Sequence, residues 1–97
     1  MQLRALEYIV AVDETRNFGR AAKVCYVSQP TLSIQIKKME DYLGVRLFDR
    51  SSKTVEPTSV GIEIIALSKA ILFLSDEIKE VSSQHTQNRE HYLLTID

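Results

Sequence analysis

The chain has 97 residues, a hydrophobic content of 44%, a formal net charge of -1 and one cysteine. This suits a single small domain with an appended helix and excludes an intrinsically disordered chain. The lone cysteine excludes an intrachain disulfide and a cysteine-rich metal site, so we expect a reduced, cytoplasmic protein. Glu63, Ser68 and Lys69 interrupt the longest apolar stretch, so we expect no membrane span.

The N-terminal half predicts two helices joined by a turn. Apolar residues recur at helical spacing from Leu3 to Thr15, and again over a shorter segment from Phe18 to Cys25. Ala21 and Ala22 lie on the inner side of the second helix, where small side chains allow a third helix to approach closely. Cys25 shares this inner side, so we interpret it as a small core residue rather than a redox switch.

The segment VSQPTLSIQIKKMEDYLG predicts a third helix with well-marked ends. Ser28 is a good N-cap, Pro30 lies in the first turn, where its missing N–H costs nothing, and Gly44 is a typical helix terminator. One face is apolar and buried, and it consists of Leu32, Ile36, Met39 and Leu43. At about 100° per residue, Ile34 points to the opposite side, among serine and lysine side chains.

Beyond Gly44 the pattern changes to two short strands, around Leu47 and around Val55–Pro57, that flank the polar tip Arg50–Lys53. Thr58 then caps a long last helix, because nothing between Gly61 and Arg89 breaks one. Two stripes of apolar residues run along this helix. The first has the a/d spacing of three heptads and predicts dimerisation, and it consists of Ile64, Leu67, Ile71, Leu74, Ile78 and Val81. The second, expected to face the preceding domain, consists of Ile62, Ile65 and Leu72.

The predicted fold class is therefore mainly α: a winged helix-turn-helix with a short two-stranded wing and a long C-terminal linker or dimerisation helix. We expect residues 1–57 to form the winged helix-turn-helix and residues 58–90 the linker helix. Tyr92–Ile96 has the composition of a strand. We interpret residues 91–97 as the start of an effector-sensing domain that the chain does not include.

Charge is distributed unevenly along the chain. The segment from Arg16 to Lys53 contains eight basic and three acidic residues, a net charge of +5. The segment from Ile62 to Asp97 has a net charge of -3. This asymmetry predicts a phosphate-binding surface joined to a part of the chain that does not bind phosphate.

In a winged helix-turn-helix, the second helix of the motif enters the DNA major groove and the wing reaches the adjacent backbone or minor groove. Ile34 would then meet the one apolar group that the groove offers, the thymine methyl. The residues predicted to contact bases are Gln29, Thr31, Ser33, Ile34 and Gln35. The predicted backbone and wing contacts are Arg20, Ser28, Lys37, Lys38, Arg50, Ser51, Ser52 and Lys53.

The run NFGRAAKVCYVSQPTLSIQIKKMEDYLGVRLFDR, followed by PTSVG, closely resembles the N-terminal DNA-binding domain of LysR-type transcriptional regulators. The resemblance covers Leu3 to about Val81. Within the family, YIVAVDETRNFGRAA and VCYVSQPTLSIQIKKMEDYLGV look most like the hydrogen-peroxide-responsive, OxyR-like branch. This resemblance implies a bacterial, nucleoid-associated regulator of peroxide-response genes.

The resemblance also implies roles for particular positions. Family members contact bases through the positions of Gln29, Pro30 and Ser33, and their wing usually places an arginine where this chain has Lys53. Their long helix pairs with its twin, commonly antiparallel, which gives a homodimer on a pseudo-palindromic double-stranded DNA site. Pairing of dimers into a tetramer stays open.

The sequence leaves two other classes of function to consider. A protein-interaction module could use the winged helix to bind protein and the last helix to oligomerise, and its binding would lack the steep salt dependence of DNA binding. An enzyme would need a nucleophile–base pair, a phosphate-binding glycine loop or a metal cluster, and we find none. His85 and His91 lack a third metal ligand, and we expect Glu40 and Asp41 to be solvated or paired with Lys37. No catalytic residue, metal or cofactor is therefore expected.

Overall fold

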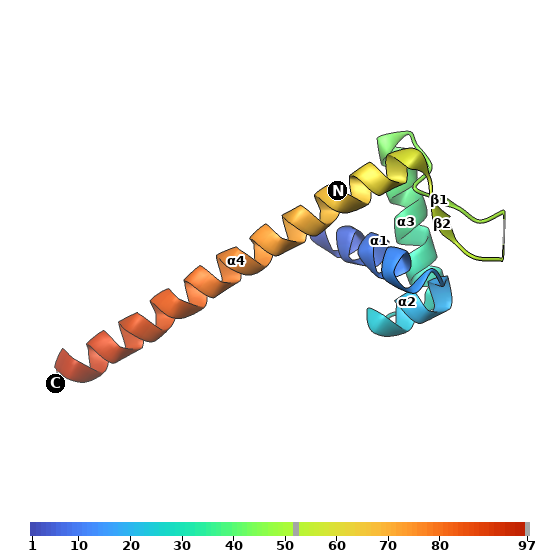
Figure 1. Ribbon diagram of the computed structural model, residues 1–97. Helices are drawn as coiled ribbons and strands as arrows, with labels where there is room; N and C mark the ends of the chain where they lie inside the picture. The colour runs from blue at the N-terminus through green and yellow to red at the C-terminus, as the bar shows by residue number, and fades with distance from the viewer. Residues whose placement is uncertain (52, 97) are drawn as a thin grey trace.

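A winged helical unit forms one end of the molecule, and a single long helix starts on this unit and runs away from it (Figure 1). The computed structural model describes residues 1–51 and 53–96, and for residues 87–96 it describes the backbone alone. The molecule measures 65 × 24 × 20 Å. The elements in chain order are α1 (Leu3–Thr15), α2 (Phe18–Val24), α3 (Gln29–Leu43), β1 (Phe48–Asp49), β2 (Glu56–Pro57) and α4 (Ser59–Ile96).

Local caps define both ends of α3 and the start of α4. Ser28 Oγ accepts a hydrogen bond from the Thr31 N–H at 3.2 Å, and α3 ends at Gly44, whose φ of 73° is left-handed. Thr58 Oγ1 accepts from the Gly61 N–H at 3.0 Å at the start of α4. The predicted ends of α3 and the predicted cap of α4 are confirmed. The second helix is one residue shorter than predicted, because Cys25 is its C-cap.

The hydrophobic core lies between the three short helices and is closed by the wing. Ile9 and Val12 of α1 and Leu32 and Ile36 of α3 are fully buried. Leu47, just before β1, and Phe48, the first residue of β1, are fully buried in the same core. The Phe18 and Phe48 rings meet edge to face, with their centroids 6.2 Å apart. Burial of each large apolar side chain contributes about 1.5–3 kcal/mol.

The wing is a two-stranded antiparallel sheet in which Phe48 pairs with Pro57 and Asp49 pairs with Glu56. Glu40 of α3 secures the approach to this sheet. Its buried carboxylate accepts a hydrogen bond from the Leu47 N–H at 2.8 Å. The expectation that Glu40 is solvated or paired with Lys37 is therefore wrong. Its ion-pair partner is Arg46, whose Nε lies 3.5 Å away.

The first turns of α4 pack closely on the winged unit. Ile65 and Ser68 are buried, and Lys69 Nζ pairs with Asp13 of α1 at 3.3 Å. A Cβ added at Gly61 would lie 2.1 Å from the Leu47 carbonyl oxygen. Only glycine allows the helix to approach the backbone of the wing segment this closely.

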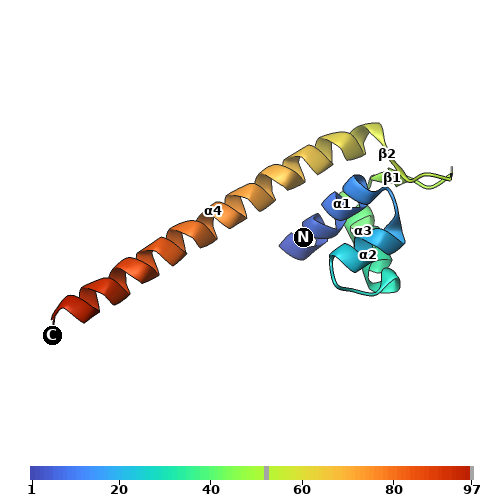
Figure 2. The ribbon, with the colours of Figure 1, turned by 60° about the horizontal axis from the view of Figure 1, so that its bottom comes forward.

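Beyond these turns, the C-terminal half of α4 extends away from every other element in both views (Figures 1 and 2). The helix continues to Ile96, so the prediction of a strand at Tyr92–Ile96 is wrong. Strand composition is a weak preference, and a helix gains one hydrogen bond for each residue it adds where no glycine or proline intervenes. None of the helices in the described ranges combines the length and apolar character that crossing a bilayer requires.

The two apolar stripes of α4 are divided differently from the prediction. Ile65 and Leu72 pack against the core as expected, but Ile62 is exposed. Ile64, predicted to belong to the outer stripe, is partly buried against the winged unit. The free outer stripe therefore starts at Leu67, and it consists of Leu67, Ile71, Leu74, Ile78 and Val81.

Candidate nucleic-acid interface

The first turn of α3 presents its side chains to solvent. Gln29, Pro30 and Thr31 are all exposed. Ser28 Oγ accepts the Thr31 N–H and also donates to Thr31 Oγ1 at 2.9 Å, so the two hydroxyls are held together. The cap thus fixes the backbone of the turn that carries three of the predicted base contacts.

The outward side of α3 is centred on Ile34. Its side chain is 53% exposed, whereas Leu32 and Ile36 on the opposite side are fully buried. Ser33 and Gln35, on either side of Ile34, are partly buried. The predicted outward direction of Ile34 is confirmed, and it makes this isoleucine an apolar point within a polar surface.

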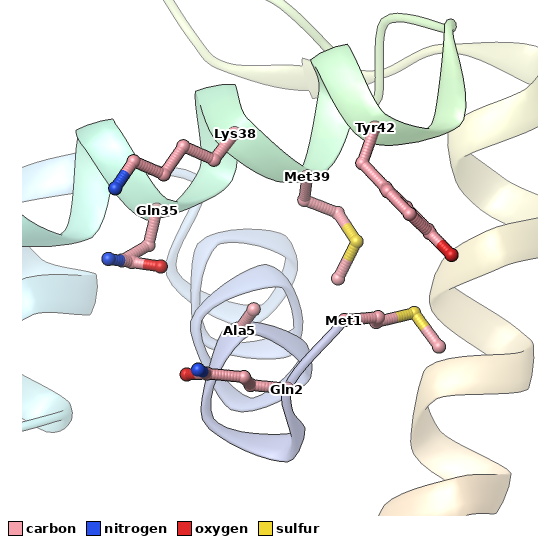
Figure 3. Close-up of a pocket in the computed structure, with 7 residues that line it drawn as sticks. All are labelled: Met1, Gln2, Ala5, Gln35, Lys38, Met39 and Tyr42. Atoms are coloured by element: carbon pink, nitrogen blue, oxygen red, sulfur yellow. The ribbon is translucent and has the colours of Figure 1, made fainter.

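Gln35 lies at the flank of α3 that faces the start of α1. Figure 3 shows Gln35 and Lys38 beside a hollow of about 310 Å³ whose floor includes Ala5 and Met39. Tyr42 and Met1 stand at its other end. Gln35 is therefore farther from the centre of the outward surface than Ile34.

Basic side chains surround the outward surface of α3. Lys37 and Lys38 are exposed on α3 itself, and Arg20 is exposed on α2. The Arg50 guanidinium lies over the Phe18 ring, 4.1 Å from its centroid, which is a cation–π contact. This contact fixes Arg50 between the wing and the helices, where it borders the same hollow as Lys37.

A small hollow of about 180 Å³ lies between α3 and the base of the wing. Lys37, Arg46 and Arg50 line it together with Ser33. Glu40 and Asp41 also border it, so basic groups outnumber acidic ones by only one. The hollow is weakly cationic rather than a strong anion site.

The tip of the wing carries the exposed residues Ser51 and Lys53. The Ser51 N–H donates to Asp49 Oδ1 at 2.9 Å. The side-chain and backbone hydrogen bonds from Ser51 lower the pKa of the Asp49 carboxyl. The wing therefore keeps a negative charge at its base, and Lys53 provides positive charge at its tip. Ser52, another predicted contact, lies outside the described residues.

Two positions have roles that sequence reasoning missed. Arg16 was counted among the basic residues, but its guanidinium pairs with Glu56 of the wing at 2.5 Å and with Asp13 at 3.3 Å. Tyr26, in the turn before α3, adopts a left-handed φ of 57° and is 94% exposed. Arg16 and Glu56 are 40 residues apart, so no local sequence pattern indicates their ion pair. Tyrosine rarely adopts a left-handed backbone conformation, so the sequence did not indicate this conformation at Tyr26.

Cys25 is buried, as predicted, and its thiol takes no part in the exposed surface. Burial raises the pKa of this thiol, which disfavours the reactive thiolate. Arg4 of α1 donates a hydrogen bond to the Cys25 carbonyl oxygen and so ties the turn before α3 to the first helix.

Comparisons with known proteins agree with this geometry. Residues 3–62 match the family described as bacterial regulatory helix-turn-helix protein, lysR family. The DNA-binding transcriptional dual regulator OxyR of Escherichia coli K12 is 48% identical over 84 residues, which are 87% of this chain. The chain spans only 28% of the length of that relative.

Solved structures give the same result. Full-length OxyR from Pseudomonas aeruginosa is 46% identical and superposes with a TM-score of 0.82, over 86% of this chain and 28% of that one. The BenM DBD in complex with benA site 1 DNA is 34% identical and superposes with a TM-score of 0.83, over 87% of this chain and 94% of that one. The mainly helical fold, the two-stranded wing and the long last helix are shared with these regulators. The chain therefore belongs to the lysR family of bacterial regulatory helix-turn-helix proteins.

Proposed function

We propose that this chain is the sequence-specific, double-stranded DNA-binding domain of a transcriptional regulator and acts as a homodimer. The observation that carries the proposal is the outward surface of α3. Its capped first turn exposes Gln29, Pro30 and Thr31, and its centre exposes Ile34 beside Lys37. A helix that exposes hydrogen-bonding and apolar groups in its first turns, followed by lysines, matches the base edges and flanking phosphates of a DNA major groove.

In this proposal, α3 enters the major groove by its N-terminal half. Gln29, Thr31, Ser33 and Gln35 hydrogen-bond to base edges, and Pro30 packs beside them. A glutamine carboxamide can pair with adenine through two hydrogen bonds. Ile34 contacts a thymine methyl, which would explain an exposed isoleucine in the middle of a polar surface.

The DNA backbone is held on both sides of the reading helix. Arg20, Ser28, Lys37 and Lys38 contact phosphates beside the groove. Arg50, already placed over the Phe18 ring, contacts the backbone at the base of the wing, and Ser51, Ser52 and Lys53 contact it at the tip. These contacts orient the domain, whereas sequence preference comes from α3.

Dimerisation is assigned to the outer stripe of α4. Leu67, Leu74, Ile78 and Val81 are between 60% and 71% exposed, and Ile71 between them is 37% exposed. They repeat at heptad spacing along a helix that projects beyond the winged unit. Pairing of two such stripes would place two reading helices on a pseudo-palindromic site. Further pairing of dimers into tetramers would involve parts of a longer protein.

The regulator is proposed to act in the bacterial cytoplasm, on the nucleoid, at genes of the peroxide response. The support is the name of several relatives, hydrogen peroxide-inducible genes activator. Residues 1–57 are the reading unit in this proposal and residues 58–90 the linker. Residues 91–97 lead towards an effector-sensing domain. The chain needs no cofactor or metal and has no enzymatic role.

The test is selection of bound duplexes from a random DNA pool at two salt concentrations. We expect an interrupted palindrome to be enriched and the affinity to fall steeply with salt, because each neutralised phosphate releases counterions. No enrichment, with weak binding at both salt concentrations, would reject DNA reading and favour a protein-interaction module.

A further inference from the structure

Two side chains of the wing segment contact the ring of Phe18, the first residue of α2. The Phe48 ring meets it edge to face, with the centroids 6.2 Å apart, and the Arg50 guanidinium lies 4.1 Å from its centroid. Phe48 and Arg50 are two residues apart, the spacing that places side chains on the same side of an extended segment. One ring therefore contacts both the first strand of the wing and the cation that follows it.

The ring and the cation differ in burial. Phe18 is 8% exposed and Phe48 is fully buried, so the core fixes the Phe18 ring in place. Arg50 is exposed, and no carboxylate in the described part of the chain pairs with it. A long, unpaired side chain at a surface is ordinarily free to adopt many rotamers. Its contact with a buried ring therefore restrains a cation that would otherwise be mobile.

The restrained cation lies beside the reading helix. Arg50 borders the hollow of about 180 Å³ that Ser33 and Lys37 of α3 also line. An aromatic ring offers the guanidinium no lone-pair acceptor, so its N–H groups stay available to a phosphate, which can accept two of them at once. The arrangement thus presents a positioned, unpaired guanidinium next to the outward surface of α3.

We propose that Phe18 is a positioning residue for DNA binding: its ring holds the Arg50 guanidinium in place for a backbone phosphate at the base of the wing. Without the ring, Arg50 would have to be ordered when DNA binds. Ordering one long side chain weakens an affinity by about two- to tenfold. Phe18 itself touches no DNA. The inference rests on the proposed function, in which Arg50 contacts the DNA backbone.

The experiment is a double-mutant cycle of Phe18→Leu and Arg50→Ala in the whole 97-residue chain. Leucine keeps the position apolar and changes no charge, so the overall electrostatic attraction to DNA is the same. Affinities are measured at one salt concentration for the selected duplex and for an unrelated duplex of equal length. Circular dichroism at the same temperature verifies that each variant is folded. Phe48→Leu is the matched control, because it removes the same pair of rings and leaves the ring that Arg50 contacts.

We expect Phe18→Leu to weaken both duplexes by the same factor, about two- to tenfold, because a phosphate contact carries no sequence information. In the Arg50→Ala background, Phe18→Leu should have no further effect, because the side chain through which it acts is gone. In Phe48→Leu, Arg50→Ala should cost the same factor as in the wild type. The NMR signals of the Arg50 guanidinium protons in the free protein should be shifted upfield by the ring, and Phe18→Leu should abolish this shift.

An unaltered affinity in Phe18→Leu would overturn the proposal. So would an effect of equal size in both backgrounds, because Phe18 would then act through the core and not through Arg50. Guanidinium signals without an upfield shift in the wild type would overturn it without recourse to any variant. Failure of the underlying function gives a different result, in which Arg50→Ala itself leaves the affinity for both duplexes unaltered.

Discussion

Replacing Glu40 tests how the wing is held to the reading helix. The Glu40 side chain is 7% exposed and accepts the Leu47 N–H at 2.8 Å. Glu40→Ala would leave the N–H of a buried residue without an acceptor, which costs about 1–3 kcal/mol. The ion pair adds little to this, because the partner Arg46 is 69% exposed. We therefore expect the free energy of unfolding to fall by about 1–3 kcal/mol, with Tm lower by roughly 4–8 °C for each kcal/mol.

Urea unfolding followed by circular dichroism measures this change. The protein concentration must be held constant, because the proposed dimerisation would make the apparent stability depend on it. Glu40→Gln retains a carbonyl acceptor and should cost less than Glu40→Ala. Arg46→Ala isolates the ion pair, and Asp41→Asn is the exposed neighbouring control; both should stay within about 0.5 kcal/mol of the wild type. If Glu40→Ala also fell within that range, the assigned role of the Leu47 hydrogen bond would be refuted.

The remaining predictions concern DNA readout and packing. Gln29→Ala should cost roughly 1–3 kcal/mol on the selected duplex and relax one base pair in fluorescence-anisotropy titrations, and equal weakening of all duplexes would exclude base readout. Lys53→Ala should weaken every duplex similarly and reduce the salt slope by about 1, whereas an unchanged slope would remove Lys53 from the phosphate contacts. Uracil in place of a contacted thymine should weaken DNA binding by the wild type but not by Ile34→Ala. Unchanged binding at every thymine would rule out a methyl contact. Gly61→Ala should lower the free energy of unfolding by about 1–3 kcal/mol because its Cβ would lie 2.1 Å from the Leu47 carbonyl oxygen, and an unaltered Tm would contradict this packing.

The features that sequence predicted well are those encoded within a few residues. Ser28, Gly44 and Thr58 each form a local cap, so the ends of α3 and the start of α4 could be located from these residues alone. The outward direction of Ile34 followed from helix periodicity. The cap and the periodicity are properties of the segment itself, and the rest of the fold does not alter them.

The features that sequence missed depend on distant partners. Glu40 is buried only because the segment that leads into the wing returns over α3 and offers the Leu47 N–H. Arg16 is not a free basic group, because the fold of the wing places Glu56 beside it and the two side chains form an ion pair. The predicted strand at Tyr92–Ile96 was wrong for another reason. These residues have the composition of a strand, but they continue the long helix α4.

The most direct test of the central claim is a map of the surface that meets DNA. Backbone amide NMR signals of the isotopically labelled chain would be followed on titration with the selected duplex and with an unrelated duplex of equal length. The account predicts that the largest changes with the selected duplex fall on residues 28–38, and that the wing around Arg50 and Lys53 responds to both duplexes. Changes confined to α4, or equal changes in α3 with both duplexes, would contradict the claim that α3 reads the sequence.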